Sequence, residues 1–244
     1  WSEPVTLASG GVRGGGFSAS PDGTITVAYV AASDQTKVAL RTRARNSVAW
    51  TDPVTVSAPA GTFGGPVNLA FNRNGDGALL GFAADGGTHT AYVSRYTHAT
   101  GTWSPDLTTV YSDSNDFNTM SDLAIAANGD IAALIELDSF TPYVRVLKAG
   151  GALGPLHELG AGGFRVIPQV AADENDRFVA AWQTVTGVPD ATLETIVSDS
   201  DGTWGAPTMV TAHGGAQSLA GDEDGRIAMT YVNRYNEGAA HMHL

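Results

Sequence analysis

The chain has 244 residues, no cysteine and a net charge of −12, from 25 acidic and only 13 basic residues. Without cysteine it forms no disulfide, thiolate metal site or catalytic thiol. Nucleic acids and anionic membranes bind basic surfaces, so this balance argues against both and favours a neutral, cationic or metal-bridged ligand. The sequence also lacks the apolar run of about 18 residues that a membrane span needs.

One short phrase, in most copies a tryptophan followed closely by proline, returns at nearly constant spacing along the chain. Its anchor residues are Trp1, Trp50, Trp103, Leu153 and Trp204, which lie 49, 53, 50 and 51 residues apart. A fixed period of this size, filled by four short strands, is typical of one blade of a β-propeller. The 30 glycines and 11 prolines agree with many short strands joined by turns.

Each repeat contains four strand-like segments, which we name A to D. The A segments align on the pairs Ser18-Ala19, Leu69-Ala70, Leu123-Ala124, Val170-Ala171 and Leu219-Ala220. A turn rich in Gly, Asp and Asn follows each pair and predicts a hairpin, because these residues tolerate the positive φ of tight turns. Segment C alternates in polarity, as in residues 37–41, and segment D is the Trp-Pro phrase, whose proline suits an outer edge strand. Segment B runs to an apolar residue, which is Tyr29, Phe82, Ile135, Trp182 or Tyr231.

The two ends of the chain complement each other in this scheme. The sequence begins with a D segment, residues 1–8, and its fifth repeat ends at residues 241–244 in a segment that aligns with C. We therefore predict an all-β fold in one domain over residues 1–244. This fold is a five-bladed β-propeller with four antiparallel strands per blade, closed by residues 1–8 completing the last blade. A start at Trp1 instead of Met indicates a removed leader or a trimmed chain.

The turns before two tryptophans resemble an Asp-box. Residues 200–204 read Ser-Asp-Gly-Thr-Trp, and residues 100–103 read Thr-Gly-Thr-Trp. With the Trp-Ser-x-Pro-Val phrase and the pattern from Asp222 to Tyr231, they make the whole chain similar to the Asp-box, sialidase-like repeat propellers of secreted actinobacterial proteins. The resemblance implies the fold and a secreted or cell-surface protein. It implies no sialidase activity, because sialidases need an arginine triad, a Tyr/Glu nucleophile pair and six blades, whereas five repeats are counted here.

Candidate binding residues come from the face shared by the D–A and B–C loops. One residue before each A anchor stands a row that is polar in four repeats: Phe17, Asn68, Asp122, Gln169 and Ser218. Asn68, Asp122 and Gln169 offer amide and carboxylate groups to sugar hydroxyls or a cation. The alternative is a water-filled channel in which ordered water satisfies these groups.

A second row places phenylalanines at equal register, six residues before the A anchors. Phe117 and Phe164 are candidate stacking platforms for sugar rings, with Asn118 and Arg165 beside them. The alternative, which also covers Phe63, is packing of each blade against its neighbour. Loops that differ between repeats add Glu136 and Tyr235 to the candidates.

Metal and cofactor chemistry finds little support in the sequence. The acidic A–B turns match no EF-hand spacing, and turn formation explains them. His241 and His243 point to one side of a strand, but no third ligand is identifiable. We expect neither a metal nor a cofactor.

The repeat scaffold without a recognisable nucleophile favours a non-catalytic, lectin-like module that binds a saccharide or another small neutral ligand. The first alternative is a glycoside hydrolase or lyase acting at the channel mouth. It would need converging carboxylates, for which Asp122, Glu136 and Asp138 are candidates. The second alternative is a structural or adhesion spacer. The residue pattern leaves all three open.

Overall fold

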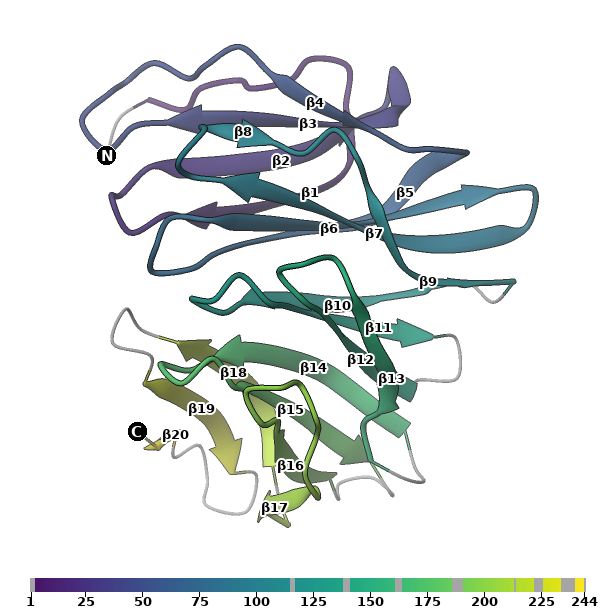
Figure 1. Cartoon of the computed structure of the whole chain (residues 1–244), viewed down its shortest axis with the longest axis vertical. Coiled ribbons are helices and arrows are strands. Elements are labelled where there is room, and N and C mark those ends of the chain that lie inside the picture. The colour runs from purple at the N-terminus through teal and green to yellow at the C-terminus, as the bar shows by residue number, and fades with distance from the viewer. Residues whose placement is uncertain are drawn as a thin grey trace.

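The computed structural model describes residues 3–114, 117–137, 141–160, 164–185, 191–212, 214–221, 226–233 and 240–243. In these ranges all regular structure is β, and no helix has the length and apolarity needed to cross a membrane. Figure 1 shows antiparallel sheets that follow one another in chain order, from the purple N-terminal sheet to the yellow C-terminal one. The predicted all-β architecture of blade-like sheets is confirmed.

The strands of the first four sheets are hydrogen-bonded in the order A, B, C and D, and those of the fifth in the order A, B and C. The first sheet contains β1 (Val12–Ala19), β2 (Ile25–Ala31), β3 (Asp34–Arg43) and β4 (Val54–Ser57). The second contains β5 (Thr62–Phe71), β6 (Gly77–Asp85), β7 (Thr88–Thr97), β8 (Thr102–Trp103) and β9 (Thr108–Asp113). The third contains β10 (Phe117–Ile125), β11 (Ile131–Leu137), β12 (Thr141–Leu147) and β13 (Leu153–Glu158). The fourth contains β14 (Phe164–Ala172), β15 (Phe178–Val185), β16 (Ala191–Val197) and β17 (Thr208–Thr211), and the fifth β18 (Gly214–Gly221), β19 (Ile227–Asn233) and β20 (Ala240–His243).

The A strands β1, β5, β10, β14 and β18 contact one another in sequence, and the D strands form the outer edges. This placement suits the D-strand prolines, because a residue without an N–H breaks no ladder at an edge. In the second sheet the D segment is split into β8 and β9, which both pair with β7. Pro105 lies between the two parts, so its missing donor falls in the gap.

Tight A–B turns close the first hairpin of the first four sheets, as predicted. Each turn has a residue with positive φ at its fourth position: Gly23, Gly75, Gly129 and Asp176. The first and last residues of each turn share one backbone hydrogen bond, from Ser20 to Thr24, Asn72 to Asp76, Ala126 to Asp130 and Asp173 to Arg177. These turns therefore give an alignment of the sheets that is independent of residue type.

This alignment corrects the sequence comparison in the first sheet by one residue. Counting back three residues from the first turn residue gives Phe17, Leu69, Leu123 and Val170, so Phe17, not Ser18, is the equivalent of Leu69. Gly16 is then the equivalent of Asn68, Asp122 and Gln169. Glycine is needed there because a Cβ on Gly16 would overlap the carbonyl oxygen of Val67 on β5.

The core is a series of apolar layers, one between each pair of successive sheets. Val30 and Leu40 pack with Phe63 and Val67 between the first two sheets, and the other layers follow the same plan. The predicted B-strand anchors are all buried: Tyr29, Phe82, Ile135, Trp182 and Tyr231. Phe63 is also buried in this way, so its role is packing between sheets.

The ends of the chain leave ring closure a prediction. Residues 3–8 lie outside any strand, and the carbonyl of Leu7 accepts a hydrogen bond from the Tyr29 hydroxyl of the first sheet at 3.3 Å. In the described part of the fifth sheet, β20 pairs with β19 alone. The face of the first sheet that has no neighbouring sheet in the described residues exposes Phe17 by 78%.

Candidate functional site

The A–B and C–D turns lie together at one end of the sheets, which we call the turn face. His98 of a C–D turn lies against Gly75 of an A–B turn, and Ala149 lies against Gly129 in the next sheet. In the third sheet the Asp130 carboxylate accepts hydrogen bonds from Lys148 Nζ and from the Ala149 amide, at 2.9 and 2.8 Å. Short antiparallel hairpins account for this arrangement, because alternate loops of a meander share one end.

A central depression of about 310 Å³ opens where the A strands reach the turn face. Strands β5, β10, β14 and β18 and the turns that follow the first three contribute to it. Small apolar residues such as Ala70, Ala124 and Ala171 contribute to its lining, most of whose exposed surface is polar. Its polar lining is supplied by Asn72, Arg73, Asp122, Asp173 and Glu174. Polar groups that converge on one concave surface are typical of a small-ligand site.

Asp122 is the half-buried carboxylate of the depression. Its Oδ2 accepts a hydrogen bond from the Val170 amide of β14 at 2.9 Å, and its Oδ1 accepts one from the Leu123 amide at 2.9 Å. Burial raises the pKa of Asp122 to about 6, although both backbone hydrogen bonds act in the opposite direction. Asp122 therefore joins the third sheet to the fourth and changes charge near neutral pH.

Asn68 and Gln169 form equivalent links from the same row. Asn68 Nδ2 donates to Ser121 Oγ of β10 at 2.6 Å, and Gln169 Oε1 accepts from the Leu219 amide of β18 at 2.7 Å. From β5 to β18 the row thus bonds each A strand to the next one, so satisfied polar contacts between sheets explain its polarity. Whether these residues also contact a ligand stays a prediction.

The other predicted residues are only partly covered. Glu136 lies on β11 opposite Pro142 and is 1% exposed. Phe117, Asn118, Phe164 and Arg165 lie on β10 and β14, but their side chains fall outside the described residues, as do Asp138 and Tyr235 entirely. The predicted site on the D–A and B–C loops consequently stays a prediction.

Arg73, Asp173 and Glu174 line the depression but were not singled out in the sequence. Each belongs to an A–B turn, where charged residues normally reflect turn chemistry. Burial alone would raise the pKa of Asp173, but hydrogen bonds from the Arg177 amide and side chain and from the Asn175 amide outweigh it and lower the pKa. Arg73 and Glu174 are exposed, which leaves their heads available at the rim.

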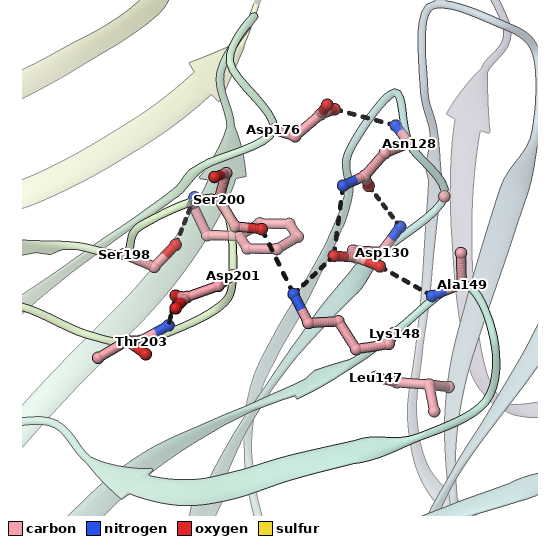
Figure 2. A network of polar contacts seen from close by, with 12 residues as sticks. Asn128, Asp130, Leu147, Lys148, Ala149, Asp176, Ser198, Ser200, Asp201 and Thr203 are labelled. Carbon is pink, nitrogen blue, oxygen red and sulfur yellow. Dashed lines mark hydrogen bonds and ion pairs between the residues drawn. The ribbon is translucent and has the colours of Figure 1, made fainter.

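The Asp-box-like turn acts as a structural element. Asp201 Oδ1 accepts the Thr203 amide at 2.9 Å, and Trp204 stacks on His157 of the preceding sheet with ring centroids 6.1 Å apart. Figure 2 shows this turn beside a polar network in which Lys148 Nζ also reaches the Ser200 carbonyl at 3.3 Å. In the same view the Asn128 amide donates to Asp176 Oδ1 at 2.9 Å. These contacts hold the third and fourth sheets together.

Within the described ranges no cluster of three or more His, Asp or Glu residues has an arrangement that could hold a metal ion. The side chains of His241 and His243 lie outside the described residues.

No protein family and no curated protein matches the sequence. Solved structures match the fold. A lectin, BP39L from Burkholderia pseudomallei, is 17% identical with a TM-score of 0.62, covering 99% of this chain and 73% of its own. A protein of unknown function from Dyadobacter fermentans is 12% identical with a TM-score of 0.61, covering 98% of this chain and 78% of its own.

An ulvan lyase, described as a new family of polysaccharide lyase, is 9% identical with a TM-score of 0.59. The match covers 94% of this chain but only 63% of the lyase. Sialidases are also among the similar structures. At these identities the likeness concerns the fold alone, and it agrees with the predicted resemblance to sialidase-like propellers.

Proposed function

We propose that the protein is a non-catalytic carbohydrate-binding module and that its central depression holds one sugar unit. The observation that carries the proposal is the convergence of carboxylate, amide and guanidinium groups on one cavity of about 310 Å³ whose lining also contains small apolar residues. The hydroxyls of a sugar fit carboxylate, amide and guanidinium groups, and its C–H groups fit the small apolar residues of the lining. The similar lectin shows that this kind of fold is compatible with sugar binding.

The carboxylates in the depression favour binding over hydrolysis. Asp173 accepts hydrogen bonds from two backbone amides and forms an ion pair with Arg177 at 2.7 Å, and its pKa is lowered. Asp122 has an amide hydrogen bond on each oxygen. A glycosidase needs one carboxyl group free to donate a proton and a second free to attack or to activate water. Carboxylates held in structural hydrogen bonds are poorly suited to either role.

Catalysis remains the second candidate because of one feature. Asp122 has a pKa raised to about 6 in the same depression as Glu174, and such a pair of carboxyl groups with different environments is typical of acid–base sites. Turnover of a polysaccharide by the wild type, abolished in Asp122→Asn, would favour this candidate. A spacer role is the third possibility, and complete absence of saccharide binding would favour it. For any of these roles we propose that the protein acts outside the cell or on its surface, as the resemblance to the Asp-box repeat propellers of secreted proteins implies.

The test is a saccharide screen followed by calorimetric titration of the ligand found. Glu174→Gln and Arg73→Gln should each weaken binding by roughly fivefold to tenfold, since each removes one charged hydrogen-bonding group. Asp201→Asn is the matched control, because Asp201 is an exposed acidic residue of the turn face that does not line the depression. Unchanged affinity in both rim variants would contradict this location of the site.

A further inference from the structure

Arg95 fills the interface between the second and third sheets at the turn face. Its guanidinium donates to the carbonyl oxygens of Gly129, Leu147 and Lys148, the last at 2.7 Å. Burial lowers the pKa of Arg95 and nearby Asp130 opposes this shift, but arginine stays charged in either case. One side chain of the second sheet thus satisfies three carbonyls of the third.

In the first sheet the position equivalent to Arg95 is occupied by a smaller residue, Thr42. Arg95 pairs with Ala78, two residues after the A–B turn, and Thr42 pairs with Thr26, which is also two residues after its turn. Thr42 is therefore the equivalent of Arg95. Its side chain is too short to reach the second sheet as Arg95 reaches the third.

A cavity of about 90 Å³ lies where the missing side chain would end. This is the volume of roughly three water molecules, enough for the four heavy atoms of a guanidinium group. Gly75 and Tyr96, which line it, are the equivalents of Gly129 and Leu147 by turn and ladder register. Two of the three positions whose carbonyls hold Arg95 thus recur around an unfilled space.

The rest of the cavity lining suits a cation. Asp22 contributes a carboxylate whose pKa is lowered by hydrogen bonds from Ser20 and Thr24. Phe71, Tyr96 and Trp103 form an aromatic cluster with ring centroids 5.4 to 6.4 Å apart, and aromatic faces attract guanidinium groups. No lysine or arginine lines the cavity among the described residues; His98 is the basic residue of the lining, and the Arg45 side chain lies beside the cavity, against Gly23.

We propose that this cavity is a second ligand site, separate from the central depression, and that it binds the guanidinium group of an external ligand such as an arginine side chain. The ligand takes the place that Arg95 occupies one interface further along. The chain's net charge of −12 favours the approach of such a cation.

The experiment follows the Trp103 indole N–H signal of the ¹⁵N-labelled full chain, assigned with Trp103→Phe, during titration with methylguanidinium. The neutral isostere N-methylurea is the matched control, since it has the same shape without the charge. We expect a saturable shift with methylguanidinium alone and roughly fivefold weaker binding in Asp22→Asn. Thr42→Arg should abolish the response, because it supplies the guanidinium from within the chain.

A converse variant tests the same reasoning at the neighbouring interface. Arg95→Ala should lower the thermal unfolding midpoint. Methylguanidinium, but not N-methylurea, should restore part of this loss, because it binds where the Arg95 guanidinium was, in addition to the cavity between the first and second sheets. If Arg95→Ala does not fold, the wild-type and Thr42→Arg titrations still decide. Blocked arginine and agmatine then distinguish a peptide side chain from a free guanidinium compound.

Three results would overturn the proposal: no saturable shift with methylguanidinium, an equal shift with N-methylurea, or an unchanged response in Thr42→Arg. Tighter binding of methylammonium than of methylguanidinium would also overturn it, because the site would then select an ammonium group.

Discussion

Two neighbouring interfaces of this protein use equivalent positions in different ways. Between the second and third sheets, Asn72 and Asn74 donate to the carbonyls of Ala126 and Ala127, both at 2.8 Å, and Arg95 adds three further bonds. Between the first and second sheets the same positions are Ser20, Asp22 and Thr42, whose side-chain hydrogen bonds in the described part of the chain stay within the first sheet.

The difference shows how the repeat separates stability from binding. Both interfaces share the apolar layer, in which Leu80 serves one and Val67 the other. Polar side chains form hydrogen bonds across the interface between the second and third sheets, whereas a cavity is left between the first and second sheets. Variation at a few turn positions can therefore create a site without changing the layers that hold the sheets together.

The largest effect on stability is expected for Arg95, which bonds across the interface between the second and third sheets. Arg95→Ala leaves three carbonyls without their donor, which should lower the free energy of unfolding by roughly 3–4 kcal/mol. Urea denaturation measures the loss. The exposed Arg73→Ala is the control and should change it by less than about 0.5 kcal/mol. Equal effects of the two substitutions would contradict the role of Arg95.

The second effect concerns the A-strand row, where Gly16 stands in the first sheet and Asp122 in the third. The folded pKa of Asp122, about 6, lies above its ordinary value near 3.9, so folding favours its protonated form. This contribution is complete below about pH 4 and is lost as pH rises through about 6, by up to about 3 kcal/mol.

Asp122→Asn removes this titration. The free energy of unfolding of the variant, relative to wild type, should therefore improve between pH 4 and 7, as measured by urea denaturation across that window. Asp201→Asn, whose aspartate has a lowered pKa, should show no such improvement. If the difference in free energy of unfolding between Asp122→Asn and wild type did not change with pH, the raised pKa of Asp122 would be contradicted.

The third comparison is between Leu69 and Phe17, which occupy equivalent positions three residues before the A–B turn of their sheets. Leu69 packs in the layer between the first two sheets, so Leu69→Ala should cost about 2 kcal/mol. Phe17 is 78% exposed, and Phe17→Ala should change stability by less than about 0.5 kcal/mol. A cost for Phe17→Ala that matches Leu69→Ala would show that the first sheet's open face is covered in solution.

The smallest effect is expected for the exposed hydrogen bond from Asn74 across the interface between the second and third sheets. Asn74→Ala removes one hydrogen bond to Ala127 and should cost about 0.5–1 kcal/mol. Asp22→Asn tests the equivalent position at the interface between the first and second sheets. Because Asp22 bonds only within its own turn among the described contacts, its variant should leave the contact between sheets unchanged. Hydrogen exchange of amides on β1 and β5 distinguishes the two cases.

The sequence predicted the sheets well because hairpins are local. The Trp-Pro phrase and the turns with Gly23, Gly75 and Gly129 mark strand ends by backbone chemistry that is visible in residue types. It placed Ser18 one residue out of register because the alanine shared by the five pairs was used as the marker, and in the first sheet Ser18, not Ala19, is the equivalent of Ala70. In the first sheet the position is defined by turn hydrogen bonds, which residue types do not show.

The site was harder to predict because its residues look like structural ones. Arg73 and Glu174 occupy A–B turns and resemble ordinary turn residues, while the polar row of Asn68, Asp122 and Gln169 mainly bonds one sheet to the next. Which end of the sheets carries a cavity depends on how side chains from four different sheets pack together. A repeating pattern in the sequence does not show how those side chains fill the space between the sheets.

The most direct test of the central claim is amide chemical-shift mapping with a saccharide that binds the wild type. The account predicts that shifts concentrate on residues 70–73, 122–127 and 170–174, around the central depression, and disappear in the double variant Arg73→Gln, Glu174→Gln. Shifts confined to the opposite end of the sheets, or unchanged in the double variant, would contradict it.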